Sequence, residues 1–188
     1  MKLGWKVKSS RLAYEGRFPV LEDVLVADLD GRETLYTYLG IQGRAVAVLA
    51  LNPSREILTV REYRHPIGKV VTDLPAGSVG GGEPPSTAAA RELREETGFQ
   101  AGRLVHFGTL SPLPALTGLV VDFFLASDLT DVGHRRDAME ILDIAWLPFD
   151  DVRDRVLSGD LVHGFLPHAV LMAHEKELVP RRAQREEG

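Results

Sequence analysis

Three carboxylates lie within five positions of one segment of this 188-residue chain: Glu92, Glu95 and Glu96. On an α-helix these are positions i, i+3 and i+4, so the side chains point toward one patch of the helix surface. Like charges placed in this way repel one another, and a bound divalent cation reverses the sign of that interaction. Hard oxygen ligands suit Mg2+ or Mn2+ better than Zn2+. The spacing therefore predicts a metal site, and the absence of cysteine excludes thiolate ligands.

The same segment also has a plainer interpretation. By itself, the run R-E-L-R-E-E at residues 91–96 is typical of a solvated helix face with Glu/Arg pairs. Its surroundings change that balance, because the run belongs to a longer pattern of nine specified positions between Gly77 and Phe99, which includes part of a loop with glycines at four of the six positions 77–82. Glycines let a loop turn tightly and expose its backbone groups.

Local signals predict that a helix carries the carboxylates from Ser86 to Thr97. Prolines precede it, a hydroxyl at its start can accept from the amides of the first turn, and Gly98 follows as a C-cap that tolerates positive φ. Alanines and Leu93 provide the face that packs, so the carboxylates are held on another face. Arg91 and Glu83 are interpreted as structural, since an arginine fork can fix a loop carboxylate against a helix.

The segment as a whole resembles a complete Nudix box, the signature of the Nudix hydrolases. The pattern G-x5-E-x7-R-E-U-x-E-E-x-G-U, in which U is a bulky apolar residue, is matched at every fixed position. The matching residues are Gly77, Glu83, Arg91, Glu92, Leu93, Glu95, Glu96, Gly98 and Phe99. The resemblance implies that Glu92, Glu95 and Glu96, with the loop carbonyl of Ala76, hold Mg2+, with Mn2+ as the alternative. It also implies that Gly77 and Gly98 are structural.

Length, composition and net charge exclude several other classes of function. A chain of 188 residues with 44% hydrophobic residues is expected to form one compact domain with a small N-terminal addition. A net charge of -5 argues against a nucleic-acid partner. No apolar stretch has the length of a membrane span or a signal-peptide core. We therefore expect a cytoplasmic protein that binds neither nucleic acid nor membrane.

The remaining elements predict the fold class. Short alternating runs with a D-G turn at residues 30–31 predict an antiparallel meander before the box. Two apolar runs joined by an N-P-S turn predict paired central strands. The expected fold class is α/β: a Nudix-type α/β/α sandwich around a mixed sheet, as the resemblance implies, with a small N-terminal antiparallel β subdomain.

The expected segments are 1–42 for the subdomain, 43–180 for the Nudix domain and 181–188 for a mobile charged tail. The expected strands are Trp5–Tyr14, Val20–Asp28, Thr34–Leu39, Ala45–Leu51, Ile57–Tyr63, Arg103–Leu110, Leu119–Ala126 and Ile141–Trp146, and the expected later helices are Phe149–Leu157 and Pro167–Glu177.

Three motifs outside the box resemble the ADP-ribose pyrophosphatase branch of the family. They are R-E-Y-R at residues 61–64, L-P-A-G at 74–77, and Pro114, fifteen residues after Phe99. The resemblance implies hydrolysis of ADP-ribose to AMP and ribose 5-phosphate. It also implies a homodimer in which the N-terminal meander is exchanged between subunits; the alternative for the meander is an ordinary extension of the sheet.

The implied chemistry is attack of water on phosphorus in a pyrophosphate, which requires a base. From the branch, Glu140 is the first candidate, Glu95 the second and Asp143 the third; the alternative for Glu140 is a solvated loop carboxylate. Arg64 is the candidate phosphate ligand, because a planar guanidinium suits phosphate oxygens, although an arginine at a strand end is commonly a surface charge. Weaker candidates are Arg44 and Arg61 for phosphate and Trp5 and Tyr14 for stacking on a base, whereas His65, His106 and His163 have no metal-ligand spacing.

One loop departs from the branch pattern. The branch commonly has a glutamate where this chain has Leu119, at the end of the segment 113–119. Loss of an acceptor that pairs with substrate hydroxyls alters selectivity. Two alternatives to an ADP-ribose hydrolase therefore stay open: a hydrolase of another nucleoside diphosphate sugar, and a noncatalytic Nudix domain that binds a nucleotide sugar as a sensor.

Overall fold

The computed structural model describes residues 4–133 and 141–179. The described residues fall into two compact units. The first consists of residues up to Arg44 together with Leu110–Val120, and the second of Ala45–Thr109 and the residues from Val121 onward. Glu140 lies outside the described residues.

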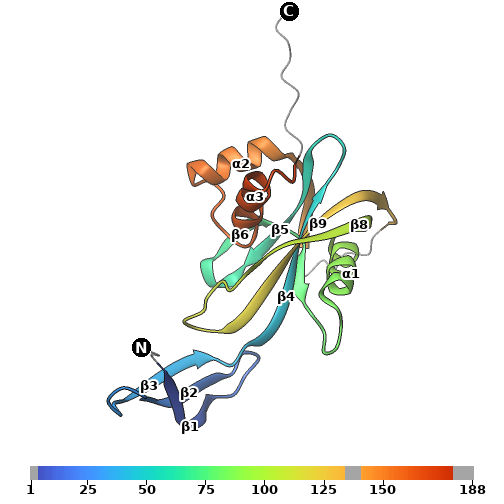
Figure 1. Cartoon of the computed structure of the whole chain (residues 1–188). Helices are drawn as coiled ribbons and strands as arrows, with labels where there is room; N and C mark the ends of the chain where they lie inside the picture. Colours follow the sequence, from blue (N-terminus) through green and yellow to red (C-terminus); the bar gives the residue numbers. More distant parts are fainter. Residues whose placement is uncertain (1–3, 134–140, 180–188) are drawn as a thin grey trace, which may run out of the picture. The chain divides into compact units, whose positions relative to one another are not determined.

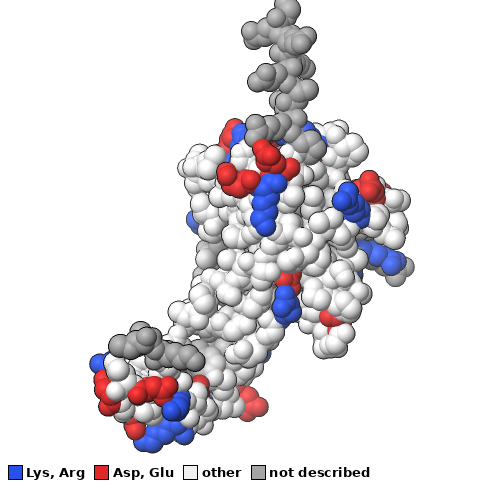
Figure 2. Space-filling model, in the orientation of Figure 1, with Lys and Arg blue, Asp and Glu red and all other residues white. Residues whose placement is uncertain are grey.

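The first unit contains a three-stranded antiparallel sheet in the order β1-β2-β3 (Figure 1). Gly31 makes the turn between the last two strands with φ of +70° and donates its N–H to the carbonyl of Ala27. Figure 2 shows charged side chains of both signs gathered over this sheet. Lys8 and Glu33, for example, form an ion pair at 2.5 Å. The strands are β1 (Trp5–Tyr14), β2 (Val20–Ala27) and β3 (Glu33–Leu39), which confirms the predicted meander.

A distant segment completes this unit. Leu39 donates its N–H to the carbonyl of Leu116 at 2.8 Å, and Gly118 donates to the carbonyl of Ile41 at 3.0 Å. The hydroxyl of Tyr36 donates to the carbonyl of Ala115 at 2.7 Å. The loop that departs from the branch pattern therefore packs with the N-terminal sheet, which the sequence did not indicate.

The second unit is built on a seven-stranded sheet. Its main path has the order β10-β5-β4-β9-β8; β6 pairs with β5, and β7 pairs with β4. Two short strands, β6 and β7, were not predicted, since neither has a long enough apolar pattern. The strands are β4 (Gln42–Leu51), β5 (Glu56–Arg64), β6 (Lys69–Asp73), β7 (Ala76–Ser78), β8 (Phe99–Leu110), β9 (Gly118–Asp131) and β10 (Ile141–Pro148), with a 3-10 turn η1 (His65–Ile67) after β5.

Helices cover both faces of this sheet (Figure 1). α1 (Pro85–Thr97) packs through Leu93 against Val46 and Val48, which are alternate residues of β4 and therefore point to one face. On β9, Phe123 points to the opposite face and contacts His168 of α3 (Leu166–Glu175) at 5.1 Å between ring centroids. α2 (Phe149–Ser158) contacts α3. The α/β/α sandwich is thus confirmed. No helix of the described residues has both the length and the apolar character that crossing a membrane requires.

A buried carboxylate fixes the start of α3. One oxygen of Asp73, at the end of β6, accepts the N–H groups of Phe165 and Leu166 at 2.9 Å each, and also that of Leu74. Burial raises the pKa of Asp73, although the three backbone donors partly oppose it. Asp73, at the end of β6, therefore caps the N-terminus of α3, whose own N-cap residue makes no side-chain hydrogen bond.

The ends of α1 differ in one respect from the prediction. The N-cap is Pro84, with Pro85 in the first turn and no side-chain hydrogen bond to the cap, so the Ser86 and Thr87 hydroxyls do not have the predicted role. Fixed φ at the prolines is sufficient to start the helix. Gly98 ends it as predicted, with φ of +77° and its N–H bonded to the carbonyl of Arg94.

Candidate active site

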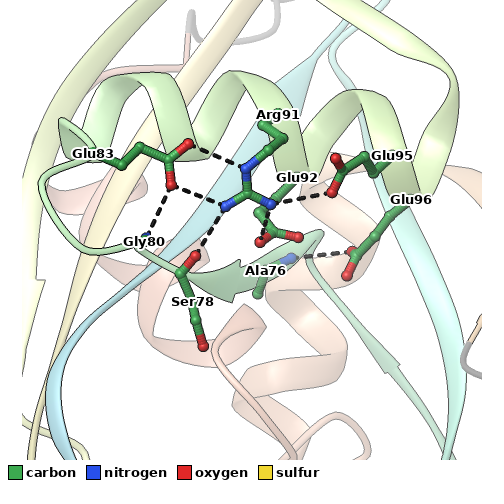
Figure 3. A network of polar contacts seen from close by, with 8 residues as sticks. All are labelled: Ala76, Ser78, Gly80, Glu83, Arg91, Glu92, Glu95 and Glu96. Atoms are coloured by element: carbon green, nitrogen blue, oxygen red, sulfur yellow. Dashed lines mark hydrogen bonds and ion pairs between the residues drawn. The ribbon is translucent and has the colours of Figure 1, made fainter.

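Arg91 joins the glycine-rich loop to the helix (Figure 3). Its Nε and Nη2 each donate to one carboxylate oxygen of Glu83 at 3.1 Å, and Nη2 also donates to the carbonyl of Ser78 at 3.0 Å. The Glu83 carboxylate in turn accepts the N–H of Gly80 at 2.9 Å. The hydrogen bonds from Arg91 and Gly80 lower the pKa of Glu83, so both ends of this fork stay charged. The fork that the sequence predicted is present.

Arg91 also touches two of the three clustered carboxylates, which the sequence did not predict. Its Nη1 donates to Glu92 at 2.8 Å and to Glu95 at 3.1 Å. Hydrogen bonds to Glu83 and then Glu92 raise the pKa of Arg91, so it remains a cation. Burial raises the pKa of Glu92, while Arg91 partly offsets that effect. One guanidinium therefore holds together charges that would otherwise repel one another.

The short strand β7 supports the other side of the cluster. Glu96 accepts the N–H of Ala76 at 3.1 Å. A Cβ added at Gly77 would overlap the carboxylate of Glu92, so only glycine permits this close approach. β7 is itself held by β4, where Val46 pairs with Gly77. The carboxylates of Glu92 and Glu96 thus both lie against a backbone segment that the sheet fixes.

The carboxylate oxygens around β7 are the type of ligand that a hard cation such as Mg2+ prefers. Glu92 is a carboxylate with 13% of its side chain exposed, and Glu95, with 58% exposed, is free to change rotamer at low cost. As the side chains lie, no three His, Cys, Asp or Glu residues of the described chain form a group that could hold a metal ion. Arg91 contacts both Glu92 and Glu95, so Glu95 could serve as a cation ligand only by giving up its contact with Arg91.

A cavity of about 800 Å³ lies beside this network, along α1. Its volume is in the range typical of small-molecule sites. Arg91 and Glu95 belong both to its lining and to the network described above. The cavity therefore gives a ligand space beside one of the predicted metal ligands. The lining residues are Thr87, Ala90, Arg91, Arg94, Glu95, Gln100, Ala101 and Gly133.

The remaining predicted residues are placed as follows. Arg64 ends β5, with half of its side chain exposed, and forms an ion pair with Glu62. Asp143 is exposed on β10 and accepts the N–H of Ile144 at 2.9 Å. Exposed positions are also found for Arg44, Arg61, Trp5 and Tyr14, the last two on β1.

One polar cluster was missed by the sequence. Nε2 of His106 lies 3.2 Å from the buried carboxylate of Asp122, which also accepts the hydroxyl of Thr109 at 2.9 Å. The three residues come from β8 and β9, and no local pattern relates them. Only the pairing of those strands brings them together.

Comparison with known proteins agrees with this fold. Residues 41–164 match the NUDIX domain family. The ADP-ribose pyrophosphatase of Mycobacterium tuberculosis (strain ATCC 25618 / H37Rv) is 37% identical over 133 residues, which span 69% of this chain and 64% of that protein. The ADP-ribose pyrophosphatase of Bacillus subtilis (strain 168) is 30% identical over 135 residues, spanning 71% and 73% respectively. The solved structure of an ADP compounds hydrolase shares the fold, with a TM-score of 0.83 over 94% of this chain and 96% of that one, at 20% identity.

The sandwich and the acidic helix define a Nudix domain, and the chain belongs to the Nudix family. Nudix hydrolases generally use divalent metal ions. The chain spans slightly less than two thirds of the length of the M. tuberculosis relative.

Proposed function

We propose that this chain is a Mg2+-dependent Nudix pyrophosphohydrolase that cleaves a nucleoside diphosphate linked to another group, with ADP-ribose giving AMP and ribose 5-phosphate as the leading reaction. The observation that carries the proposal is the Arg91 network, which gathers Glu92 and Glu95 on the helix face. The names of the M. tuberculosis and B. subtilis relatives support the substrate.

In this proposal Glu92, Glu95, Glu96 and the carbonyl of Ala76 hold the cation, with Mn2+ as an alternative to Mg2+. When bound, a divalent cation neutralises phosphate oxygens and makes water a better nucleophile. The protein contributes the positions of the ligands. β7 fixes Glu96 through the N–H of Ala76, and the Glu83–Arg91 pair fixes the loop.

The base that takes the proton from water is a separate part of the proposal. Glu140 is the first candidate, and it lies outside the described residues. Glu95 and Asp143 follow; Glu95 borders the cavity along α1, and Asp143 is exposed. A Glu140→Gln variant with lower turnover and unchanged metal affinity supports Glu140, whereas an unchanged rate moves the role to Glu95 or Asp143.

The substrate is expected to be a small molecule. Arg64 is proposed to bind a phosphate, exchanging its contact with Glu62 for the substrate. Leu119 offers no carboxylate, and its N–H is bonded to the hydroxyl of Thr117. Another nucleoside diphosphate sugar is therefore the first alternative substrate. On the face shown in Figure 2, blue and red groups are interspersed, consistent with a partner other than nucleic acid.

A homodimer and a cytoplasmic location stay predictions. Trp5, Val7 and Leu12 of β1 are each about half exposed, and large apolar groups in this number are typical of an interaction surface. Covering them with a second copy of the chain would remove that surface from water. Sedimentation of the whole chain tests the dimer: a monomer at micromolar concentration contradicts it.

The function is tested by product release from ADP-ribose, other nucleotide sugars, dinucleotides and nucleoside triphosphates, with Mg2+, with Mn2+ and with chelator. We expect AMP and ribose 5-phosphate from ADP-ribose, in the presence of metal only. Preference for another substrate retains the mechanism and replaces the substrate. Binding without turnover on every compound contradicts the enzyme and favours the sensor.

A further inference from the structure

The strand β8 forms one edge of the seven-stranded sheet. In the order β10-β5-β4-β9-β8, its neighbour among the described strands is β9 alone, so the backbone on the other side of β8 is paired with no described strand. The strand is 12 residues long, from Phe99 to Leu110. A long open edge of this kind is able to accept a further strand from another chain.

A cavity of about 440 Å³ lies along this edge, and we call it the β8 groove. No described residue of β9 lines it, which places it on the outer side of β8. Its apolar lining includes Val105 and Leu178, and Val105 is 36% exposed, so the groove is open to solvent. The described lining residues are Val105, His106, Phe107, Gly108, Lys176 and Leu178.

One lysine covers part of the edge. Lys176 is the exposed C-cap of α3, and its Nζ donates to the carbonyl of Phe107 at 2.6 Å. The helix reaches the edge because it packs closely on β8: a Cβ added at Gly108 would overlap Sδ of Met172. A lysine at a strand edge is a common means of keeping other strands away. A partner that offers a carboxylate to the ammonium and a backbone N–H to the carbonyl replaces both halves of this contact.

The charges of the edge favour an acidic partner over a second copy of β8. The strand contains two basic residues, Arg103 and His106, both exposed, and no Asp or Glu. Pairing β8 with itself would bring basic side chains together, and like charges directly opposite destabilise a sheet. Glu175 and Glu177 flank Lys176 along the chain but are not among the described lining residues. Since His106 already contacts a buried carboxylate, Arg103 and Lys176 are the cations for a partner.

We propose that the β8 groove binds an extended acidic peptide segment, which adds to β8 as a further strand. Main-chain hydrogen bonds to the open edge give affinity in this mode of recognition, and alternate side chains give specificity. An apolar side chain of the segment lies between Val105 and Leu178, and a carboxylate takes the ammonium of Lys176. The partner is therefore a protein, and the inference does not rest on the proposed hydrolysis.

The proposal is tested by fluorescence anisotropy of labelled peptides with the full chain. The probe repeats Val-Thr-Asp-Thr, so that valine and aspartate alternate along one face of the strand that it forms. The comparison peptide has lysine in place of aspartate. We expect the acidic peptide to bind about tenfold more tightly, since like charges across an interface oppose association. Equal affinities overturn the proposal.

Strand addition is separated from simple charge attraction by backbone methylation of the acidic probe. One version is methylated on the Thr nitrogens and the other on the Val and Asp nitrogens, and both keep every side chain. In an added strand the N–H groups of alternate residues face the neighbour, so we expect one version to lose about tenfold in affinity and the other to lose little. The unmodified probe should also slow amide hydrogen exchange at residues 103–109. Equal affinities of the two versions, or slowed exchange only elsewhere, overturn strand addition.

Two variants of Lys176 locate the site. Lys176→Glu reverses the charge at the groove, and we expect the preference for the acidic peptide to disappear. Lys176→Gln keeps a donor for the carbonyl of Phe107 without the charge, and we expect the preference to fall to about threefold or less. The matched control is Lys69→Glu, the same change at an exposed position of β6, which should retain the full preference.

An unchanged preference in both Lys176 variants overturns the proposal. So does amide exchange in β8 that slows as the concentration of the chain alone is raised, because a second copy then occupies the edge. The peptide comparisons on the native chain decide the question where a variant fails to fold.

Discussion

The acidic groups of α1 and the acidic group of β2 are held in opposite ways. Around α1, Arg91 contacts Glu83, Glu92 and Glu95, so negative charges share one cation. In the first unit, Asp23 is buried with one oxygen bonded to Tyr38 and the other without a described partner. The first arrangement is a nearly complete network, whereas in the second one carboxylate oxygen has no partner in the part of the chain that the structure describes.

The two regions differ in how far the polar groups of each are already paired. In the helix cluster, Arg91 offsets the negative charges, and under the proposed function Glu95 exchanges its contact with Arg91 for a cation. In the first unit, Oδ1 of Asp23 has no donor among the described residues. Fully satisfied buried polar networks make a structure rigid, while a buried polar group without a partner lowers stability.

Replacing Glu96 by Gln gives the largest expected effect. Gln keeps the size and the acceptor for the N–H of Ala76, but it loses the charge that a metal requires. We expect metal-dependent turnover of ADP-ribose to fall roughly 100- to 1,000-fold, with the thermal midpoint nearly unchanged. The control, Glu175→Gln on the exposed end of α3, leaves the rate intact. A Glu96→Gln enzyme with near-native turnover removes Glu96 from the ligands.

Replacing Arg91 by Lys tests whether the paired network is the important feature. An ammonium group cannot span Glu83, Ser78, Glu92 and Glu95 at once. We expect a rate about 10- to 100-fold lower and weaker activation in a Mg2+ titration, as for the loss of a residue that orients metal ligands. Arg103→Lys, an exposed change of the same type on β8, should have no effect. Equal rates for the two variants contradict the role of the network.

Asp73 provides a third case, a buried carboxylate with donors from backbone only. Asp73→Ala removes the acceptor for Phe165 and Leu166 at the start of α3, and we expect about 2 kcal/mol lower free energy of unfolding in urea. Unchanged stability means that α3 does not depend on this cap.

Asp73→Asn isolates the charge while keeping an acceptor. Because the folded pKa of Asp73 is raised above its ordinary value of 3.8, the folded state binds more protons than the unfolded state in the pH window from 3.8 up to the folded pKa. The contribution of Asp73 to stability is therefore full below this window and is lost as pH rises through it. We expect Asp73→Asn to gain stability relative to the native chain with rising pH in unfolding curves. A constant difference across these pH values contradicts the raised pKa.

Tyr38→Phe gives the smallest expected effect and tests the unpaired region. It removes the described donor to Asp23, and we expect about 1 kcal/mol lower stability, the net value of one hydrogen bond. Turnover should change much less than for Arg91→Lys. Tyr14→Phe, at an exposed position of β1, is the control for unfolding measurements. A loss of stability equal in both variants argues against a significant Tyr38–Asp23 bond.

Much of the helix region followed from sequence because its signals are local. The spacing of Glu92, Glu95 and Glu96 on one helix, the stop at Gly98 and the pairing of Arg91 with Glu83 all depend on contacts within about twenty positions. The N-cap was wrong because two prolines start α1 without a hydroxyl cap. β7 was missed because three residues contain no periodicity.

The contacts around Asp23 and around Asp73 could not be predicted, since the residues involved lie far apart in the chain. The hydroxyl of Tyr36 meets the carbonyl of Ala115, 79 positions later. The contacts of Asp73 with Phe165 and Leu166 span more than 90 positions. Neither pair belongs to a motif.

The sequence alone determined the acidic helix, its family and the antiparallel N-terminal meander, because a helix or hairpin sets its own side-chain spacing. Only the tertiary structure decided that Arg91 binds Glu92 and Glu95, that β7 supports Glu96, and that one oxygen of Asp23 has no partner among the described residues. Those features depend on which donors reach a buried carboxylate. That choice is made by the packing of strands and loops whose separation along the chain leaves no periodic trace.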